Sequence, residues 1–260
     1  MLCYNCRREL DKSIKTKEHI PAQAFYVGYS EEYKINRITV PACKKCNEGF
    51  SKTDQELRDA IGVTNDKGKH NEEYTRKSIS SILKKNGKNK LHFDSLGNVE
   101  KVGFEYSPIR KSAIKDFKGI FYYKFGYPLS KEWRVEIVAN FEKQENVVIA
   151  AKGMYAYVNK GINWSVSGHE DIFRYKLKTL VPDIHGVIND TGEVDKAVSI
   201  ASILEYHKRF SFVVVAAKHE RINSLIKRPK KKKNRRKDIK KQILRNKALK
   251  RLRHKLKCRK

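Results

Sequence analysis

The sequence predicts an α+β fold from two observations. Strand patterns and helix patterns both occur along residues 91–226, and a hairpin pattern directly precedes a long amphipathic helix there. Before this segment lie a cysteine-rich part, residues 1–63, and a polar linker, residues 64–90, with one short helix over residues 74–85. Residues 227–260 form a basic tail. We therefore expect two folded domains, 1–63 and 91–226, and no motif indicates the role of the second.

The elements of residues 91–226 follow from local patterns. Residues 91–104 are typical of a hairpin that turns at Leu96-Gly97-Asn98. Ser107 as N-cap and Pro108 at the first position predict the start of a helix. Further along, residues 146–158 and 210–217 are predicted as strands and residues 196–207 as a helix. One face of the helix after Pro108 is apolar and is predicted to be core: Ile109, Ala113, Ile114, Phe117, Ile120 and Phe121.

The formal charge of +29 is concentrated in the tail. Residues 227–260 hold 20 Lys and Arg side chains and one acid, a net +19, while the rest of the chain carries 38 basic and 28 acidic side chains. Such a block repels itself unless a polyanion neutralises it. We therefore predict that the tail binds nucleic acid through its densest run: Lys230, Lys231, Lys232, Lys233, Arg235, Arg236 and Lys237. A solubilising tail, membrane-surface binding and nuclear import are the alternatives.

Nothing in the sequence indicates a membrane protein. The longest apolar stretch, residues 210–217, is far shorter than the roughly 20 residues that span a bilayer. No apolar signal segment follows Met1. We expect a cytoplasmic protein associated with nucleic acid, neither secreted nor membrane-bound.

Four of the five cysteines form two pairs of metal-ligand spacing, Cys3-x-x-Cys6 and Cys43-x-x-Cys46. Each pair can occupy two vertices of a tetrahedral thiolate site, so we predict a structural Zn²⁺ ion. Disulfides are the weaker alternative, because nothing suggests an oxidising compartment. Cys258 stands alone and is predicted to be an idle, reduced thiol.

The residues around these pairs resemble the HNH endonuclease family. The resemblance consists of Cys3-x-x-Cys6, then Glu18-His19-Ile20-Pro21, then Cys43-x-x-Cys46-Asn47, and it covers roughly the first 60 residues. It implies a zinc-stabilised ββα-metal fold of treble-clef type, in which a hairpin carries the Glu-His pair and a helix beginning at Asn47 follows.

The resemblance also implies metal-dependent hydrolysis of phosphodiester bonds in DNA, giving 5′-phosphate and 3′-hydroxyl ends. His19 would be the general base, and Glu18 and Asn47 would hold a catalytic Mg²⁺ or Mn²⁺ ion. The family's His-orienting Asn is replaced here by Ile38, so Asn36 or a backbone carbonyl would have to take that role. Asp54 and Glu56, further along the helix, are predicted to be surface acids, with a contribution of one of them to metal binding as the alternative.

Two readings of function stay open. The first is an HNH-type endonuclease acting on double-stranded DNA, with RNA as the other substrate and with residues 91–226 reading a target, forming a homodimer or docking a protein partner. The second is a non-catalytic zinc-finger protein that binds DNA or RNA, in which Glu18 and His19 only end a strand; Ile38 favours it.

Overall fold

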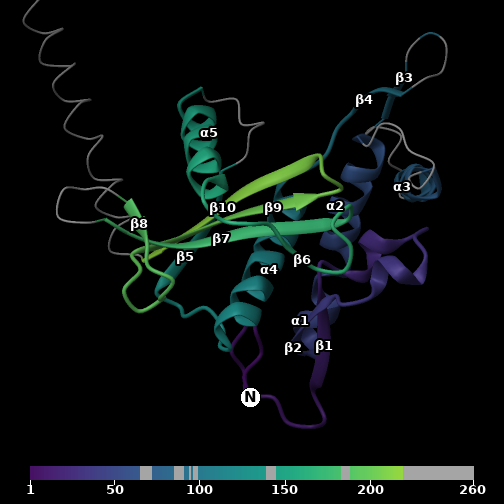
Figure 1. Ribbon diagram of the computed structural model, residues 1–260. Helices are drawn as coiled ribbons and strands as arrows, with labels where there is room; N and C mark the ends of the chain where they lie inside the picture. The colour runs from purple at the N-terminus through teal and green to yellow at the C-terminus, as the bar shows by residue number, and fades with distance from the viewer. Residues whose placement is uncertain are drawn as a thin grey trace, which may run out of the picture. The chain divides into compact units, whose positions relative to one another are not determined.

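The computed structural model describes residues 1–64, 72–84, 91–93, 95, 99–138, 145–182 and 188–218 (Figure 1). The described part is a mixture of helix and sheet, as predicted. The turn predicted at Leu96-Gly97-Asn98, Cys258 and the basic run of the tail lie outside the described residues.

A hairpin opens the fold. Strands β1 (Lys15–Ile20) and β2 (Ile38–Cys43) pair antiparallel, and two single-turn 3-10 helices, η1 (Gln23–Tyr26) and η2 (Glu31–Lys34), lie in the connection between them. Two helices follow at once, α1 (Lys44–Gly49) and α2 (Ser51–Thr64). The helix predicted to begin at Asn47 is thus present, but it begins three residues earlier, at Lys44, and is interrupted at Phe50.

The register of this hairpin decides which side chains share a face. Glu18 lies opposite Val40, and His19 lies opposite Thr39. Because successive side chains of a strand point to opposite faces, Glu18 shares its face with buried Ile20 and Val40, whereas His19 lies on the other face.

The helix predicted within the linker is confirmed as α3 (Glu72–Lys84), which packs on α2. The predicted hairpin is confirmed as β3 (Leu91–Phe93) and β4 (Val99–Val102). Helix α4 (Tyr106–Phe125) then begins one residue before Ser107. The N-cap prediction for Ser107 is wrong, because Glu105 precedes the first helical residue and no side chain caps the helix. Pro108 lies in the first turn, where its missing N–H costs no helical hydrogen bond.

The second half of the unit is a six-stranded sheet with the order β5-β10-β9-β7-β6, and β8 pairs with β7 beyond this path. The pairings of β9 with β10 and β7, and of β7 with β6 and β8, are antiparallel. The elements are β5 (Trp133–Val138), α5 (Glu145–Asn159), β6 (Ser165–Val166), β7 (Phe173–Pro182), β8 (Ile188–Asp190), β9 (Ser199–Tyr206) and β10 (Phe210–Lys218).

Two predictions for this half are wrong and one is confirmed. Residues 146–158, predicted as a strand, lie in helix α5, and residues 196–207, predicted as a helix, contain strand β9. The strand predicted over residues 210–217 is confirmed as β10. The first error arises because the β-branched residues of α5 favour a strand locally, and the second because a strand covered on both faces loses its alternating pattern.

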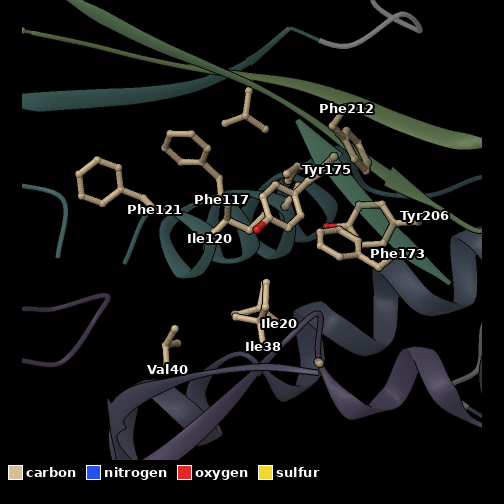
Figure 2. Packing of buried hydrophobic residues seen from close by; sticks show 14 of the residues in the cluster. Ile20, Ile38, Val40, Phe117, Ile120, Phe121, Phe173, Tyr175, Tyr206 and Phe212 are labelled. Carbon is tan, nitrogen blue, oxygen red and sulfur yellow. The ribbon is translucent and has the colours of Figure 1, made fainter. Parts of the chain in front are cut away.

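Helix α4 lies between the hairpin and the sheet. Figure 2 shows Ile20, Ile38 and Val40 of the hairpin on one side of α4, and aromatic side chains of the sheet, Phe173, Tyr206 and Phe212, on the other. All belong to one apolar cluster. The predicted core face of α4 is confirmed, with Ile114 only partly buried. Helix α5 covers the opposite face of the sheet over a smaller cluster that contains Val158 and Ile203.

Residues Met1–Ala217 form one compact unit, which ends one residue before Lys218, the last described residue. The described residues of the segments predicted as separate domains, 1–63 and 91–226, share one core within this unit. None of the described helices has the length and apolar character that crossing a bilayer requires.

Candidate functional site

The four paired cysteines converge at the start of the fold. Cys3 and Cys6 lie in the N-terminal loop, Cys43 ends β2, and Cys46 lies in α1. Their sulfur atoms all lie within 4.8 Å of one another. All four are free thiols, and the Sγ atoms of Cys6 and Cys43 are 3.7 Å apart, against about 2.05 Å in a disulfide. The cluster can therefore hold a metal ion such as zinc.

Backbone hydrogen bonds hold the first cysteine pair against β2. The Arg7 N–H donates to the Cys3 carbonyl at 3.0 Å, and Arg7 adopts the left-handed conformation (φ 65°) that reverses the chain. The Tyr4 N–H donates to the Pro41 carbonyl at 3.0 Å. The Cys43 N–H lies 3.4 Å from Cys3 Sγ, so β2 also supports the first pair by a backbone contact to sulfur.

The pKa values of the thiols are shifted in both directions: burial raises those of Cys6 and Cys46, whereas that of Cys43 is lowered. Burial alone would raise the pKa of Cys43, but hydrogen bonds from the Cys46 backbone and the other three cysteine side chains lower it to about 7. A thiolate, the form that binds metal, is therefore accessible near neutral pH. Asn5 Nδ2 contacts Cys46 Sγ at 3.5 Å, and Lys118 of α4 donates to Asn5 Oδ1 at 3.0 Å. Helix α4 thus supports the cluster through Asn5.

His19 is half-buried on the outer face of the hairpin. Burial lowers the pKa of its imidazole below the usual 6.5, and the positive charges of Arg37, Lys115 and Lys17 lower it further. The ring is therefore neutral at pH 7 and can accept a proton. The charges of Lys17 and Arg37 make its surroundings attractive to an anion.

Glu18 has the opposite environment. Its side chain is only 4% exposed, and its Oε1 atom lies 3.3 Å from Lys115 Nζ on α4. Burial raises the pKa of Glu18, Lys115 opposes this rise, and Asp54 adds to it. Glu18 is thus an ion-paired, buried carboxylate rather than an open ligand.

Two further acids meet the same ammonium group. Lys115 Nζ lies 2.8 Å from Asp54 Oδ2 and 3.4 Å from Asp116 Oδ1. Ser112 donates to Asp54 at 2.5 Å, and the Tyr206 hydroxyl donates to Asp116 at 2.7 Å. We call Glu18, Asp54, Lys115 and Asp116 the Lys115 cluster. The prediction that Asp54 is a surface acid is wrong, because Lys115 provides a buried partner for it. Glu56, the other predicted surface acid, is half-buried.

The two asparagines of the predicted site are less engaged. Asn47 is half-buried on α1, which packs against both hairpin strands, but in the described part of the chain no hydrogen bond joins it to Glu18 or His19. Asn36 is exposed, has a left-handed backbone (φ 58°), and accepts from the Gly168 N–H through its carbonyl at 3.3 Å. Within the described residues its side chain makes no hydrogen bond to His19, and Thr39 is the cross-strand neighbour of that ring.

Sequence reasoning missed Lys115, Asp116, Lys118 and Tyr206, all of which come from residues 91–226. No motif connects them with the hairpin, since Lys115 and Glu18 are 97 positions apart. The sequence contained one weak signal for them. Lys115 and Asp116 lie next to the apolar face of the predicted helix, so their side chains are too close to the core to reach solvent. The predicted nucleic-acid-binding residues of the tail lie outside the described part.

No family model, curated protein or solved structure matches this chain. The resemblance to HNH endonucleases therefore rests on the motif of the first 60 residues.

Proposed function

We propose that this protein is a metal-dependent endonuclease of HNH type that hydrolyses phosphodiester bonds in DNA, with His19 as the general base. The observation that carries the proposal is the state of His19: a half-buried imidazole of lowered pKa among positive charges. The hairpin that carries it is followed directly by a helix, and a cysteine cluster able to hold zinc joins the two. A hairpin followed by a helix supports the ββα-metal fold that we propose for this part of the chain.

The chemistry follows from these surroundings. Neutral His19 takes a proton from the water molecule that attacks phosphorus. The positive charges of Lys17 and Arg37 favour the negative charge that grows on the phosphate oxygens. The bond to the 3′ oxygen breaks, which leaves 5′-phosphate and 3′-hydroxyl ends. Zinc at the four cysteines has a structural role, because all four ligand positions are protein thiolates.

The residues proposed to hold the catalytic Mg²⁺ or Mn²⁺ ion fit it only in part. Such an ion, when bound, neutralises phosphate charge and assists the leaving oxygen. Asn47 offers an amide oxygen, but the carboxylate of Glu18 is bound to Lys115 as it stands. The Oε1 atom of Glu18 can serve as a ligand only when Lys115 releases it.

The basic tail would supply affinity that does not depend on sequence. Its 20 Lys and Arg side chains suit phosphate contacts along a duplex. Double-stranded DNA is therefore the proposed partner.

A specific observation favours the second candidate function, a non-catalytic zinc-finger protein that binds DNA or RNA. The ion pair of Glu18 with Lys115 gives that residue a structural role that needs no catalysis. Ile38, buried in the core where an orienting asparagine is expected, points the same way.

Nicking of supercoiled plasmid distinguishes the two. We expect wild type to nick with Mg²⁺ or Mn²⁺ and to stop in EDTA, with zinc content checked by elemental analysis. His19→Ala should lose the activity, whereas His92→Ala, at an exposed histidine on β3, should retain it. Equal nicking by wild type and His19→Ala would remove His19 as the base.

A further inference from the structure

The Lys115 cluster has more negative than positive charge. One ammonium group meets three carboxylates, and all four side chains are almost fully buried: Lys115 and Asp116 are 0% exposed, and Glu18 and Asp54 are 4% exposed. Three elements contribute, β1, α2 and α4. Buried charge is retained only where it is paired, so this excess of carboxylates calls for a further positive partner, either a proton or a second cation.

Several polar atoms at the cluster have no hydrogen-bond partner. Glu18 Oε2 is buried and unpaired, and the buried hydroxyl of Tyr4 has no partner either. Burial raises the pKa of Tyr4, and the charges of Glu18, Asp116 and Asp54 raise it further, so its hydroxyl lies near the cluster. Asp116 Oδ1 has no hydrogen bond and only the ionic contact with Lys115 at 3.4 Å. These oxygen atoms lie around one cation, and each could act as a ligand to a metal ion.

We infer that Lys115 is the resident cation of an oxygen-lined cation site, and that a hard divalent cation competes with its ammonium group for Glu18 and Asp54. Cation binding at Glu18, which the proposed function requires, is then controlled from α4. Only this link to cation binding for catalysis rests on the proposed function. The competition between Lys115 and a divalent cation depends on the Lys115 cluster alone.

The distances agree with such an exchange. Three carboxylate oxygens lie 2.8, 3.3 and 3.4 Å from the position of Lys115 Nζ. Calcium takes oxygen ligands at about 2.3–2.6 Å, so the oxygens need to close in by roughly 0.5–1 Å. With Lys115 in place they do not converge, and in the described part of the chain the four cysteines are the one group of His, Cys, Asp or Glu able to hold a metal as it stands. Ca²⁺ and Mn²⁺, with their tolerance for irregular oxygen sets, fit better than Mg²⁺.

The test removes the ammonium group and measures cation binding through stability. The full-length variants are Lys115→Gln and Lys115→Ala, and the control is Lys111→Gln, at an exposed lysine one turn earlier on α4. Melting temperature is recorded with zinc retained and with Ca²⁺ or Mn²⁺ added. At about a hundred times its dissociation constant, the ion should raise the melting temperature of both Lys115 variants by roughly 5–10 °C. Wild type and Lys111→Gln should shift much less.

Two results overturn the inference. The first is an equal shift, or none, in the Lys115 variants and the control. The second is a Lys115 variant that stays unfolded when Ca²⁺ is added, since the ion is expected to replace the missing charge. Circular dichroism with and without Ca²⁺ detects this case.

Plasmid nicking separates this inference from the proposed function. If Glu18 holds the catalytic ion, Lys115→Gln should lower the half-activating Mn²⁺ concentration at least about tenfold, a difference of about 1.4 kcal/mol. Thermal shifts without nicking by any of the proteins support the cation site and reject the endonuclease. Metal-dependent nicking without thermal shifts supports the endonuclease and rejects the cation site.

Discussion

Glu18 and His19 are adjacent in the chain and have opposite surroundings. The strand directs Glu18 towards α2 and α4, where Lys115 binds it, and directs His19 to the outer face beside Thr39. Glu18 therefore fixes the hairpin to the rest of the unit, while the next residue, His19, is the proposed general base. In the proposed mechanism, one strand thus carries an anchoring residue and a catalytic residue side by side.

Asp116 gives a prediction at this scale. Burial raises its pKa to about 7, although Lys115 and the Tyr206 hydrogen bond oppose the rise and Asp54 and Glu18 add to it. Between the usual Asp pKa of 3.8 and about 7, the native state therefore binds more protons than the unfolded state. The contribution of Asp116 to the free energy of unfolding should fall as pH rises through this range, by up to roughly 4 kcal/mol.

Asp116→Asn removes this titration and keeps an oxygen that accepts from Tyr206. Relative to wild type, the variant should gain stability steadily from pH 4 to pH 7, as measured by urea unfolding. Asp195→Asn, at an exposed aspartate, is the control and should show no such trend. A difference from wild type that stays constant across this range would mean that Asp116 is ionised throughout.

At the scale of elements, α4 is the centre of the unit. It is buried on nearly all sides, by the hairpin and α2 on one side and by the sheet on the other. Close approach to the hairpin occurs at Gly119, where an added Cβ atom would lie 2.4 Å from Ile20 side-chain atoms. Glycine is required there for lack of space.

Gly119→Ala should therefore destabilise the protein by about 1–3 kcal/mol, although alanine is the better helix former. The matched control is Gly153→Ala on α5, where the new methyl group meets nothing within 4 Å. That change should stabilise by about 0.5–1 kcal/mol. Urea unfolding of both variants measures the contrast, and stabilisation by Gly119→Ala would contradict the packing of α4 on β1.

The cysteine cluster connects the N-terminal loop, β2 and α1, and it gives a further prediction at this scale. Purified protein should contain about one zinc ion per chain, held by the four thiolates. Cys3→Ser should lower the zinc content and the melting temperature, because metal binding contributes to the stability of the fold. Cys258→Ser is the control and should change neither. No zinc in wild type, together with an unchanged melting temperature in Cys3→Ser, would contradict a structural metal.

The sequence predicted α4 and β10 correctly and failed at β9. This strand is central in the sheet, and its residues are buried on both faces. Ile200 and Leu204 pack in the main cluster, whereas Ala201 and Ile203 pack beneath α5. A strand covered on both faces shows no polar alternation, so its pattern cannot be distinguished from that of a buried helix.

The failure at α5 has the converse cause. Its run of Val147, Val148 and Ile149 is typical of a strand, and local propensity favoured that structure. Tertiary packing overrides it: Met154, Tyr155 and Val158, at helical spacing, meet the sheet. The sequence alone does not show that one face of the sheet needs a helix packed against it.

At the scale of the whole molecule, the motif predicted the candidate site only in part. The cysteines, and a hairpin followed by a helix, were predictable because they are local in sequence. The Lys115 cluster was not, since its partners come from segments that meet only in the folded unit Met1–Ala217. A domain boundary between residues 63 and 91 would place Glu18 and Lys115 in different domains, so their contact was not predicted.

The tail provides the prediction at this scale. If six to ten of its cations contact phosphates, the logarithm of DNA affinity should fall with the logarithm of salt concentration at a slope of about −5 to −9. Deleting residues 227–260 should flatten this slope while slow metal-dependent cleavage persists at low salt. Fluorescence anisotropy against salt measures it, and loss of all cleavage after truncation would make the tail part of the active fold.

Single-turnover cleavage of end-labelled duplex DNA by wild type and His19→Ala, both shown to contain zinc, tests directly whether His19 is the general base. We expect 5′-phosphate ends for wild type and a rate at least about a hundredfold lower for the variant, the usual contribution of a general base. Equal rates for the two proteins, or no cleavage by wild type with any divalent cation, would contradict this assignment.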